Sequence, residues 1–171
     1  NYDLRIVNVL DISGDVDLNI GNIDFNGDVN ITGNVITGVT IRAMGSIYIG
    51  GYVEGAVIKS NKDIVLNKGV NANGIGQIEA KGNISARFFE NAIVYAEGDV
   101  NAGYILSSKI MALGKVIVQG SRGTIHGGDV TGVMGIETSN AGNASYAPTN
   151  LRIGATKKLR MDYANIIVQL K

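Results

Sequence analysis

The sequence lacks several residues and segments on which common classes of protein depend. Its 171 residues contain no cysteine, no tryptophan, one proline and one histidine. Without cysteine, a disulfide scaffold and a thiolate metal site are excluded, because both need sulfur. The sequence also shows no secretory signal peptide and no apolar run of about eighteen residues, so we expect no integral membrane segment.

Charge of neither sign is in excess. Fifteen lysine and arginine residues balance fifteen aspartate and glutamate residues, so the formal net charge is zero. Proteins that bind nucleic acid through their overall field carry surplus positive charge. The basic residues here are scattered, without the interleaved aromatic residues that single-stranded nucleic acid prefers. We therefore expect no nucleic-acid partner.

Glycine is abundant, at 24 residues, or about twice its usual share. Many of the glycines belong to a repeat in which a small residue, glycine, a polar residue and a β-branched residue recur. The repeat is clearest in 80–84, 96–100 and 112–116, which follow one another at steps of sixteen residues. Lys62 takes the place of glycine in one repeat, and the aligned glycines are Gly14, Gly27, Gly45, Gly82, Gly98, Gly114 and Gly128.

Short alternating segments flank the repeated glycine, for example Val39-x-Ile41-x-Ala43 before it and Ile47-x-Ile49 after it. Alternation with a period of two indicates half-buried strands. Strands this short keep their register by stacking in parallel on copies of themselves, with glycine adopting positive φ at the corners. The sequence therefore predicts an all-β fold, a single-stranded parallel β-helix (β-solenoid) over residues 1–150. We expect about eight coils and a right-handed winding.

The period changes at the C-terminus, where we expect residues 151–171 to form a linker and the start of a C-terminal helix. Four apolar residues at steps of four, three and four resemble the a/d seam of a coiled coil over nearly two heptads. The helix either caps the last coil or begins a coiled coil, and two heptads do not decide between these. We expect a homo-oligomer that self-associates through the seam, which consists of Leu159, Tyr163, Ile166 and Leu170.

Few residues suit catalysis or metal binding. His126 has no nucleophile at a suitable spacing, and we expect it to be a corner or core residue. The glycine-rich nonapeptide of calcium β-rolls is absent, so a ladder of aspartates at equivalent corners is expected to cap turns rather than to bind calcium. These aspartates are Asp15, Asp28, Asp63, Asp99 and Asp129. The sequence predicts no catalytic residue, no metal site and no cofactor.

One rival pattern resembles the hexapeptide repeat of left-handed β-helix acyltransferases. Six aliphatic residues follow a step of about six residues, namely Ile41, Ile47, Val53, Ile58, Ile64 and Val70. The step does not last, because Val100 to Ile110 breaks it. A β-helix enzyme of this type or one acting on polysaccharides, and a bactofilin-like filament, are the alternatives to a scaffold.

Three segments resemble the flagellar assembly protein A family: "GNIDFNGDVNITGNV" (21–35), "ISARFFENAIVYAEGDV" (84–100) and "GYILSSKIMALGKVIVQGSRGTIHGGDV" (103–130). The likeness covers about residues 10 to 155, departs at Lys62 and is poor over 139–150. It implies a cytoplasmic bacterial protein with a parallel β-helix followed by a coiled coil. It also implies a role tied, in some members, to polar flagellum assembly.

The family's β-helix is similar to the C-terminal domain of the division inhibitor MinC, which dimerises and binds partners. The resemblance therefore implies a non-enzymatic scaffold or assembly protein that binds protein partners. It implies no catalytic residue.

Overall fold

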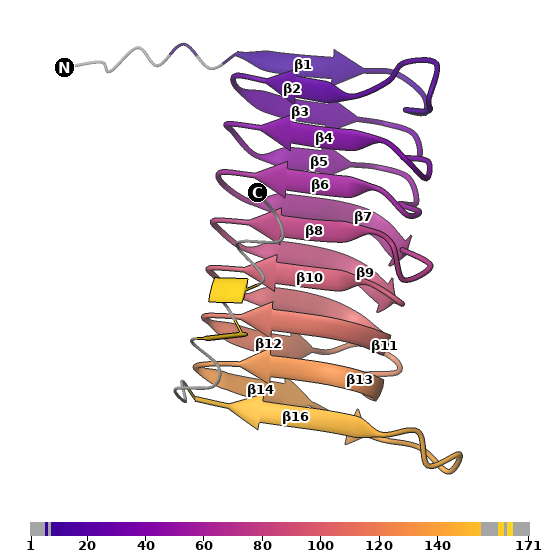
Figure 1. Cartoon of the computed structure of the whole chain (residues 1–171), viewed down its shortest axis with the longest axis vertical. Coiled ribbons are helices and arrows are strands. Elements are labelled where there is room, and N and C mark those ends of the chain that lie inside the picture. The colour runs from indigo at the N-terminus through magenta and orange to yellow at the C-terminus, as the bar shows by residue number, and fades with distance from the viewer. Residues whose placement is uncertain (1–5, 7, 155–160, 163, 166–171) are drawn as a thin grey trace, which may run out of the picture.

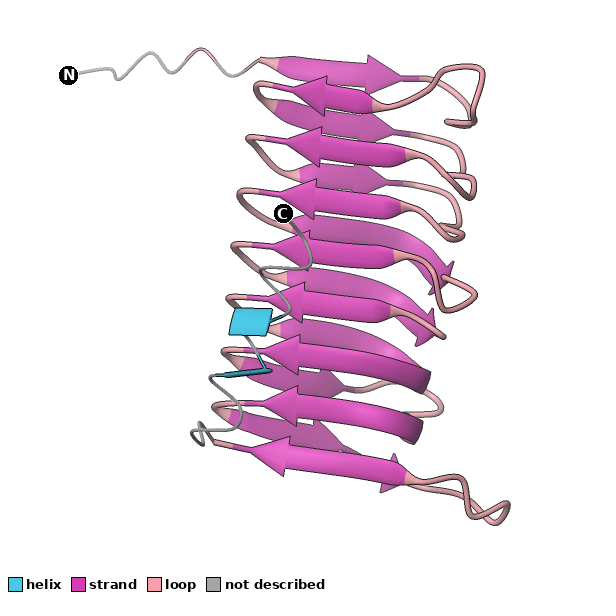
Figure 2. Ribbon diagram, in the orientation of Figure 1, coloured by secondary structure: helices cyan, strands magenta, loops and turns pink. Residues whose placement is uncertain are grey.

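The computed structural model describes residues 6, 8–154, 161–162 and 164–165 of the chain. These residues form a rod of stacked coils that advances from the N-terminal strand to the last strand (Figure 1). Sixteen strands make one sheet, and its strand pairings are parallel. Strands account for most of each coil (Figure 2). The predicted parallel β-solenoid is thus confirmed.

Each coil passes through three faces, named here by their order in the coil. Face 1 contains β1 (Val9–Ile12), β3 (Asp28–Ile31), β5 (Ile47–Ile49), the starts of β7 (Ile64–Asn71), β9 (Ile84–Glu90) and β11 (Val100–Ala112), then β12 (Lys115–Val118) and β14 (Gly135–Thr138). These eight strands begin the eight coils, which confirms the expected number. The expected handedness stays a prediction.

Face 2 follows and is the least regular. In the first four coils its pairing begins with single bridges between Val16, Val35, Val53 and Val70. In later coils it contains the ends of β7 and β9, the middle of β11, the start of β13 (Thr124–Gly132) and β15 (Asn140–Ala141).

Face 3 completes each coil. It contains β2 (Ile23–Phe25), β4 (Thr40–Ala43), β6 (Val57–Ser60), β8 (Gln77–Ala80), β10 (Ile93–Ala96), the ends of β11 and β13, and β16 (Thr149–Ile153).

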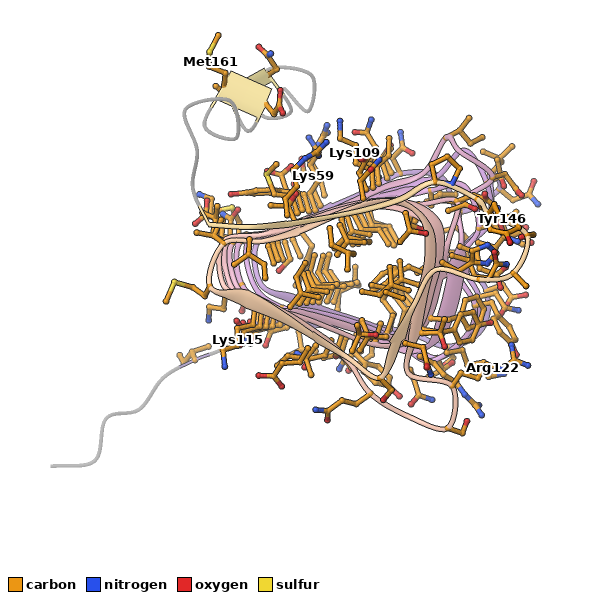
Figure 3. All side chains as sticks on the ribbon, turned by 90° about the horizontal axis from the view of Figure 1, so that it is seen from below. Lys59, Lys109, Lys115, Arg122, Tyr146 and Met161 are labelled. Carbon is orange, nitrogen blue, oxygen red and sulfur yellow. The ribbon has the colours of Figure 1, made fainter. Side chains whose placement is uncertain are left out.

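The core is a set of aliphatic columns inside the coils. Figure 3, which looks along the rod, shows apolar side chains stacked within the coils and charged side chains outside them. On face 1 the column contains Val29, Ile47, Ile64, Ile84, Val100 and Val116, each at most 1% exposed. Burial of each such side chain contributes about 1.5–3 kcal/mol, so the columns are the main stabilising force along the rod.

The six-residue step in the sequence has a geometric origin. Ile41, Ile47 and Val53 are buried on faces 3, 1 and 2 respectively, so the step is the spacing between inward residues on successive faces. In the sixth coil the spacing falls to five residues, because β11 turns through all three faces without a loop. The step therefore reflects the path of the chain and carries no chemistry by itself.

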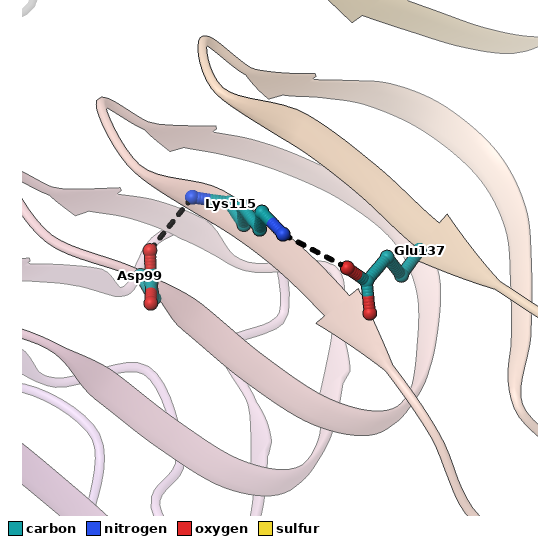
Figure 4. Close-up of polar contacts among 3 residues, drawn as sticks. All are labelled: Asp99, Lys115 and Glu137. Atoms are coloured by element: carbon teal, nitrogen blue, oxygen red, sulfur yellow. Dashed lines mark hydrogen bonds and ion pairs between the residues drawn. The ribbon is translucent and has the colours of Figure 1, made fainter.

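A polar ladder ties the coils together at the corner between faces 3 and 1. Asp63 Oδ1 accepts a hydrogen bond from the backbone N–H of Asn83 at 2.7 Å, and Asn83 Oδ1 accepts one from Asp99 at 2.8 Å. Asp99 Oδ1 in turn accepts from the backbone N–H of Lys115 at 2.7 Å (Figure 4). The lysine side chain cannot accept, and its Nζ instead pairs with Glu137 Oε1 at 3.1 Å. The side chains of Asp63, Asn83 and Asp99 thus each cap the next coil.

The repeated glycines stand beside this ladder for a reason that the sequence analysis missed. Gly45, Gly82, Gly98 and Gly114 do not have positive φ. A Cβ at Gly98 would overlap Asn83 Oδ1 and lie 2.9 Å from Gly82 O, and the other three glycines meet the preceding coil's aspartate in the same way. Glycine is required at these positions because it leaves room for the side chain of the preceding coil that caps the coil containing the glycine.

Lys62 is the exception that fits this account. The capping residue beneath it is Ser46, whose Oγ lies 3.4 Å from the backbone N of Asp63. A serine side chain is shorter than that of aspartate or asparagine, so it leaves room for a Cβ at position 62.

The predicted alignment of the repeated glycines is wrong at its first and last members, Gly14 and Gly128. Gly14 belongs to a second column at the corner between faces 1 and 2, where Gly33 N–H donates to its carbonyl at 3.0 Å. Asp15 caps Asn34 there at 2.7 Å. Gly128 lies within β13 opposite Ser108. Loops of different length shift these segments, so alignment by sequence distance fails.

The remaining aspartates cap coils or contact neighbouring strands rather than capping their own turns. Asp28 caps Ser46 at 2.7 Å, like Asp63 and Asp99. Asp129 accepts from Asn150 Nδ2 at 3.0 Å, and Arg152 lies 3.6 Å away. In the part of the chain that the structure describes, no three His, Cys, Asp or Glu residues converge as a metal site.

The rod extends beyond the expected boundary at residue 150. β16 pairs with β13 as far as Ile153, opposite Gly132. The expected C-terminal helix is not supported. After residue 154 the structure describes only 161–162 and 164–165, two pairs of residues with helical backbone. Within the described residues, no helix has the length and apolar character needed to cross a membrane.

We expect Gly98→Ala to lower the free energy of unfolding by about 1–3 kcal/mol, as overpacking does, because the new Cβ overlaps Asn83 Oδ1. Chemical denaturation followed by circular dichroism measures this. In an Asn83→Ser background, which removes the obstructing atom, the further cost of Gly98→Ala should fall below about 1 kcal/mol.

The matched control is Lys62→Ala, at the same corner but above a serine, which should change stability by less than about 0.5 kcal/mol. Equal costs of Gly98→Ala in both backgrounds would contradict the steric account.

Candidate functional site

Three aromatic side chains stack outside the rod at the corner between faces 1 and 2. The ring centroids of Phe88 and Tyr104 lie 5.1 Å apart with an interplanar angle of 9°, and those of Tyr52 and Phe88 lie 6.4 Å apart at 43°. The fold positions them because Phe88 and Tyr104 are register partners in β9 and β11. We call these three residues the aromatic stack.

A glycine makes the stack possible. Gly69 is the register partner of Phe88 in the preceding coil, between Phe88 and the coil that carries Tyr52. A Cβ at Gly69 would overlap the Phe88 ring. The ring therefore lies over bare backbone and reaches Tyr52. Phe89, the next residue, points inward and is 0% exposed, so one of the two adjacent rings fills the core and the other lies outside it.

Two cations lie over rings of the aromatic stack. Lys68 Nζ lies 4.8 Å from the ring centroid of Tyr52, and Arg122 Cζ lies 5.3 Å from that of Tyr104. Such cation–π contacts contribute about 0.5–1 kcal/mol each at exposed sites. Lys68 comes from the coil between those of Tyr52 and Phe88, and Arg122 comes from the coil after that of Tyr104.

A groove of about 980 Å³ runs beside the stack along face 1. Its floor contains Ser85 of β9 with Asn101 and Gly103 of β11, and its wall contains the aromatic stack. At Gly103 the floor is bare backbone, since a Cβ there would lie 2.6 Å from Arg87 O. Arg122, at the corner of the rod away from Lys115 (Figure 3), stands at one end.

The polar edge of the stack is fixed by a carboxylate on face 2. Tyr104 OH donates to Glu90 Oε1 at 3.1 Å, and Asn71 Nδ2 donates to Glu90 Oε2 at 3.3 Å. Burial raises the pKa of Tyr104 above its ordinary value, and Glu90 raises it further as an acceptor and as a negative charge. Tyr104 therefore stays protonated and holds its ring in the stack.

Comparison with known proteins places this geometry in a family. The sequence matches the model of the flagellar assembly protein A beta solenoid domain over residues 8–171, all but the first seven residues of the chain. This chain belongs to the flagellar assembly protein A family. No curated protein and no solved structure matches it. The solenoid with its groove is thus a flagellar assembly protein A domain.

Of the residues that the sequence singled out, His126 does not line the groove. Leu159, Tyr163, Ile166 and Leu170 lie outside the described residues. His126 lies in β13 on face 2, opposite Leu106, and directly precedes Gly127 and Gly128, whose positive φ angles mark the corner toward face 3. Its Nδ1 is 3.3 Å from Asn143 Nδ2.

Sequence analysis missed the aromatic stack and found the cations scattered. Tyr52, Phe88 and Tyr104 are 36 and 16 residues apart, so they interleave with Lys68 and Arg122 only after the coils stack. A signal was present, because the step of sixteen residues from Phe88 to Tyr104 equals the repeat that sets their register.

We expect Glu90→Gln to lower the pKa of Tyr104 toward its ordinary value, because the variant removes the negative charge beside the phenol. Titration of the Tyr104 ring resonances by NMR between neutral and alkaline pH measures the change. Glu54→Gln, which removes another face 2 carboxylate, is the matched control and should leave this pKa unchanged. An unchanged pKa in Glu90→Gln would show that burial alone causes the shift.

Proposed function

We propose that this chain is a non-enzymatic scaffold domain that binds a protein partner during flagellar assembly in the cytoplasm. The observation that carries the proposal is the groove on face 1, which a rigid solenoid presents as a preformed surface. Membership of the flagellar assembly protein A family supports the process.

The rigidity of the groove favours binding over chemistry. Its floor is sheet, held by ladder hydrogen bonds between consecutive coils, and its wall is an aromatic stack with cations over two of its rings. A surface that is ordered before the partner arrives loses little conformational entropy on binding. This property suits a scaffold that holds another protein in one orientation.

Deletion of the gene from the cells that encode it should reduce the number of flagella per cell, counted by electron microscopy. Expression of the wild-type chain should restore the number, and Lys62→Gln, on a corner away from the groove, should restore it equally. Cells that assemble normal flagella without the gene would contradict the flagellar role.

We further propose that the protein self-associates through the seam Leu159, Tyr163, Ile166 and Leu170, whose spacing is that of a coiled coil. Tyr163→Ser together with Ile166→Ser should lower the molar mass measured by light scattering, because polar residues disrupt an apolar seam. Met161→Ser, between the seam positions, is the control and should keep the wild-type mass. An unchanged mass in the double variant would reject the seam.

A further inference from the structure

The groove carries positive charge although the whole chain is neutral. Arg87 and Arg122 line it, and Lys68 lies over the ring of Tyr52. The lining contains no aspartate and no glutamate. Glu90 lies on the face 2 side of the stack, where Tyr104 and Asn71 use its oxygens. A partner in the groove therefore meets cations, amide groups and ring edges.

Several ring faces of the stack are already occupied. Phe88 and Tyr104 are stacked on each other, and cations lie over Tyr52 and Tyr104 at 4.8 Å and 5.3 Å. Proteins that bind single-stranded nucleic acid offer open ring faces on which bases stack. Less of that surface is open here, while ring edges, which carry partial positive charge, attract anions as the arginines do.

The length of the groove suits a short extended segment. Apart from Tyr52, its lining comes from four successive coils, those that begin at β7, β9, β11 and β12. Neighbouring coils are about 4.8 Å apart, so the groove spans about 15 Å along the rod. An extended chain rises about 3.3 Å per residue, so five or six residues cover this length. Amide side chains at Asn67, Asn101 and Gln119 are placed to pair with the backbone of such a segment.

We propose that the groove binds an extended acidic segment of a protein partner, with its carboxylates near Arg87 and Arg122. The proposal rests on the proposed scaffold function and names the chemistry of the partner. Carboxylates pair with guanidinium groups in a planar, two-bond geometry that favours arginine over lysine. The groove thus recognises acidic sequence through charge and extended shape.

The test uses fluorescein-labelled ten-residue peptides and the full chain, with binding measured by fluorescence anisotropy. A peptide of alternating glutamate and serine should bind, and one of alternating lysine and serine should not. Binding should weaken as salt rises, because the charges are near the surface. An oligothymidylate of ten nucleotides tests for a general preference for polyanions.

Replacement of both groove arginines, Arg87→Gln with Arg122→Gln, should weaken binding of the acidic peptide by about tenfold or more. The matched control is Lys62→Gln with Lys81→Gln, which removes the same charge at the corner between faces 3 and 1 and should leave binding unchanged. Circular dichroism confirms that both double variants fold. No binding of the acidic peptide, equal loss in both variants, or tighter binding of the oligothymidylate would overturn the proposal.

The two proposals fail in different ways. If the arginine variant loses peptide binding while the deleted cells still assemble normal flagella, the groove binds acidic peptides and the flagellar function is wrong. If deletion abolishes flagella while the acidic peptide does not bind, the scaffold function stands and the acidic-segment inference is wrong.

Discussion

The contact between a capping side chain and the glycine of the next coil is the constraint on which the rod depends. Asn83 accepts the backbone N–H of Asp99 only because Gly98 leaves its Oδ1 the necessary space. The same contact recurs along the corner and keeps consecutive coils in one register. The aliphatic columns stabilise the rod, but apolar packing alone is non-directional and does not fix register. The directional hydrogen bonds at the corner between faces 3 and 1 fix the register of the coils.

The groove is a consequence of the same register. Because each coil repeats the positions of the one before, an outward residue in one coil lies directly above its equivalent, and three rings from distant parts of the chain form one stack. Gly69 has for the Phe88 ring the role that Gly98 has for Asn83, since each leaves space for a neighbouring coil's side chain. Glycine thus permits both the capping contacts between coils and the aromatic stack of the candidate site.

The repeat made the fold predictable because period-two alternation and recurring small residues report directly on strand burial and close approach. It predicted the parallel coils and their number. It was misleading where loops differ in length, as at Gly14 and Gly128, because sequence distance no longer measures one coil. Positive φ was expected at four corner glycines that do not have it, and their actual role depends on a neighbour in another coil; they are Gly45, Gly82, Gly98 and Gly114.

The sequence by itself determined that this chain is a parallel β-solenoid of the flagellar assembly protein A family, since both inferences rest on patterns local to one or two repeats. The tertiary structure alone decided which outward residues meet. Tyr52, Phe88 and Tyr104 converge with Lys68 and Arg122 because coil stacking brings together residues that are far apart in the chain. A neutral composition therefore contains a cationic groove, because net charge is a sum over the chain and a binding surface depends on local arrangement.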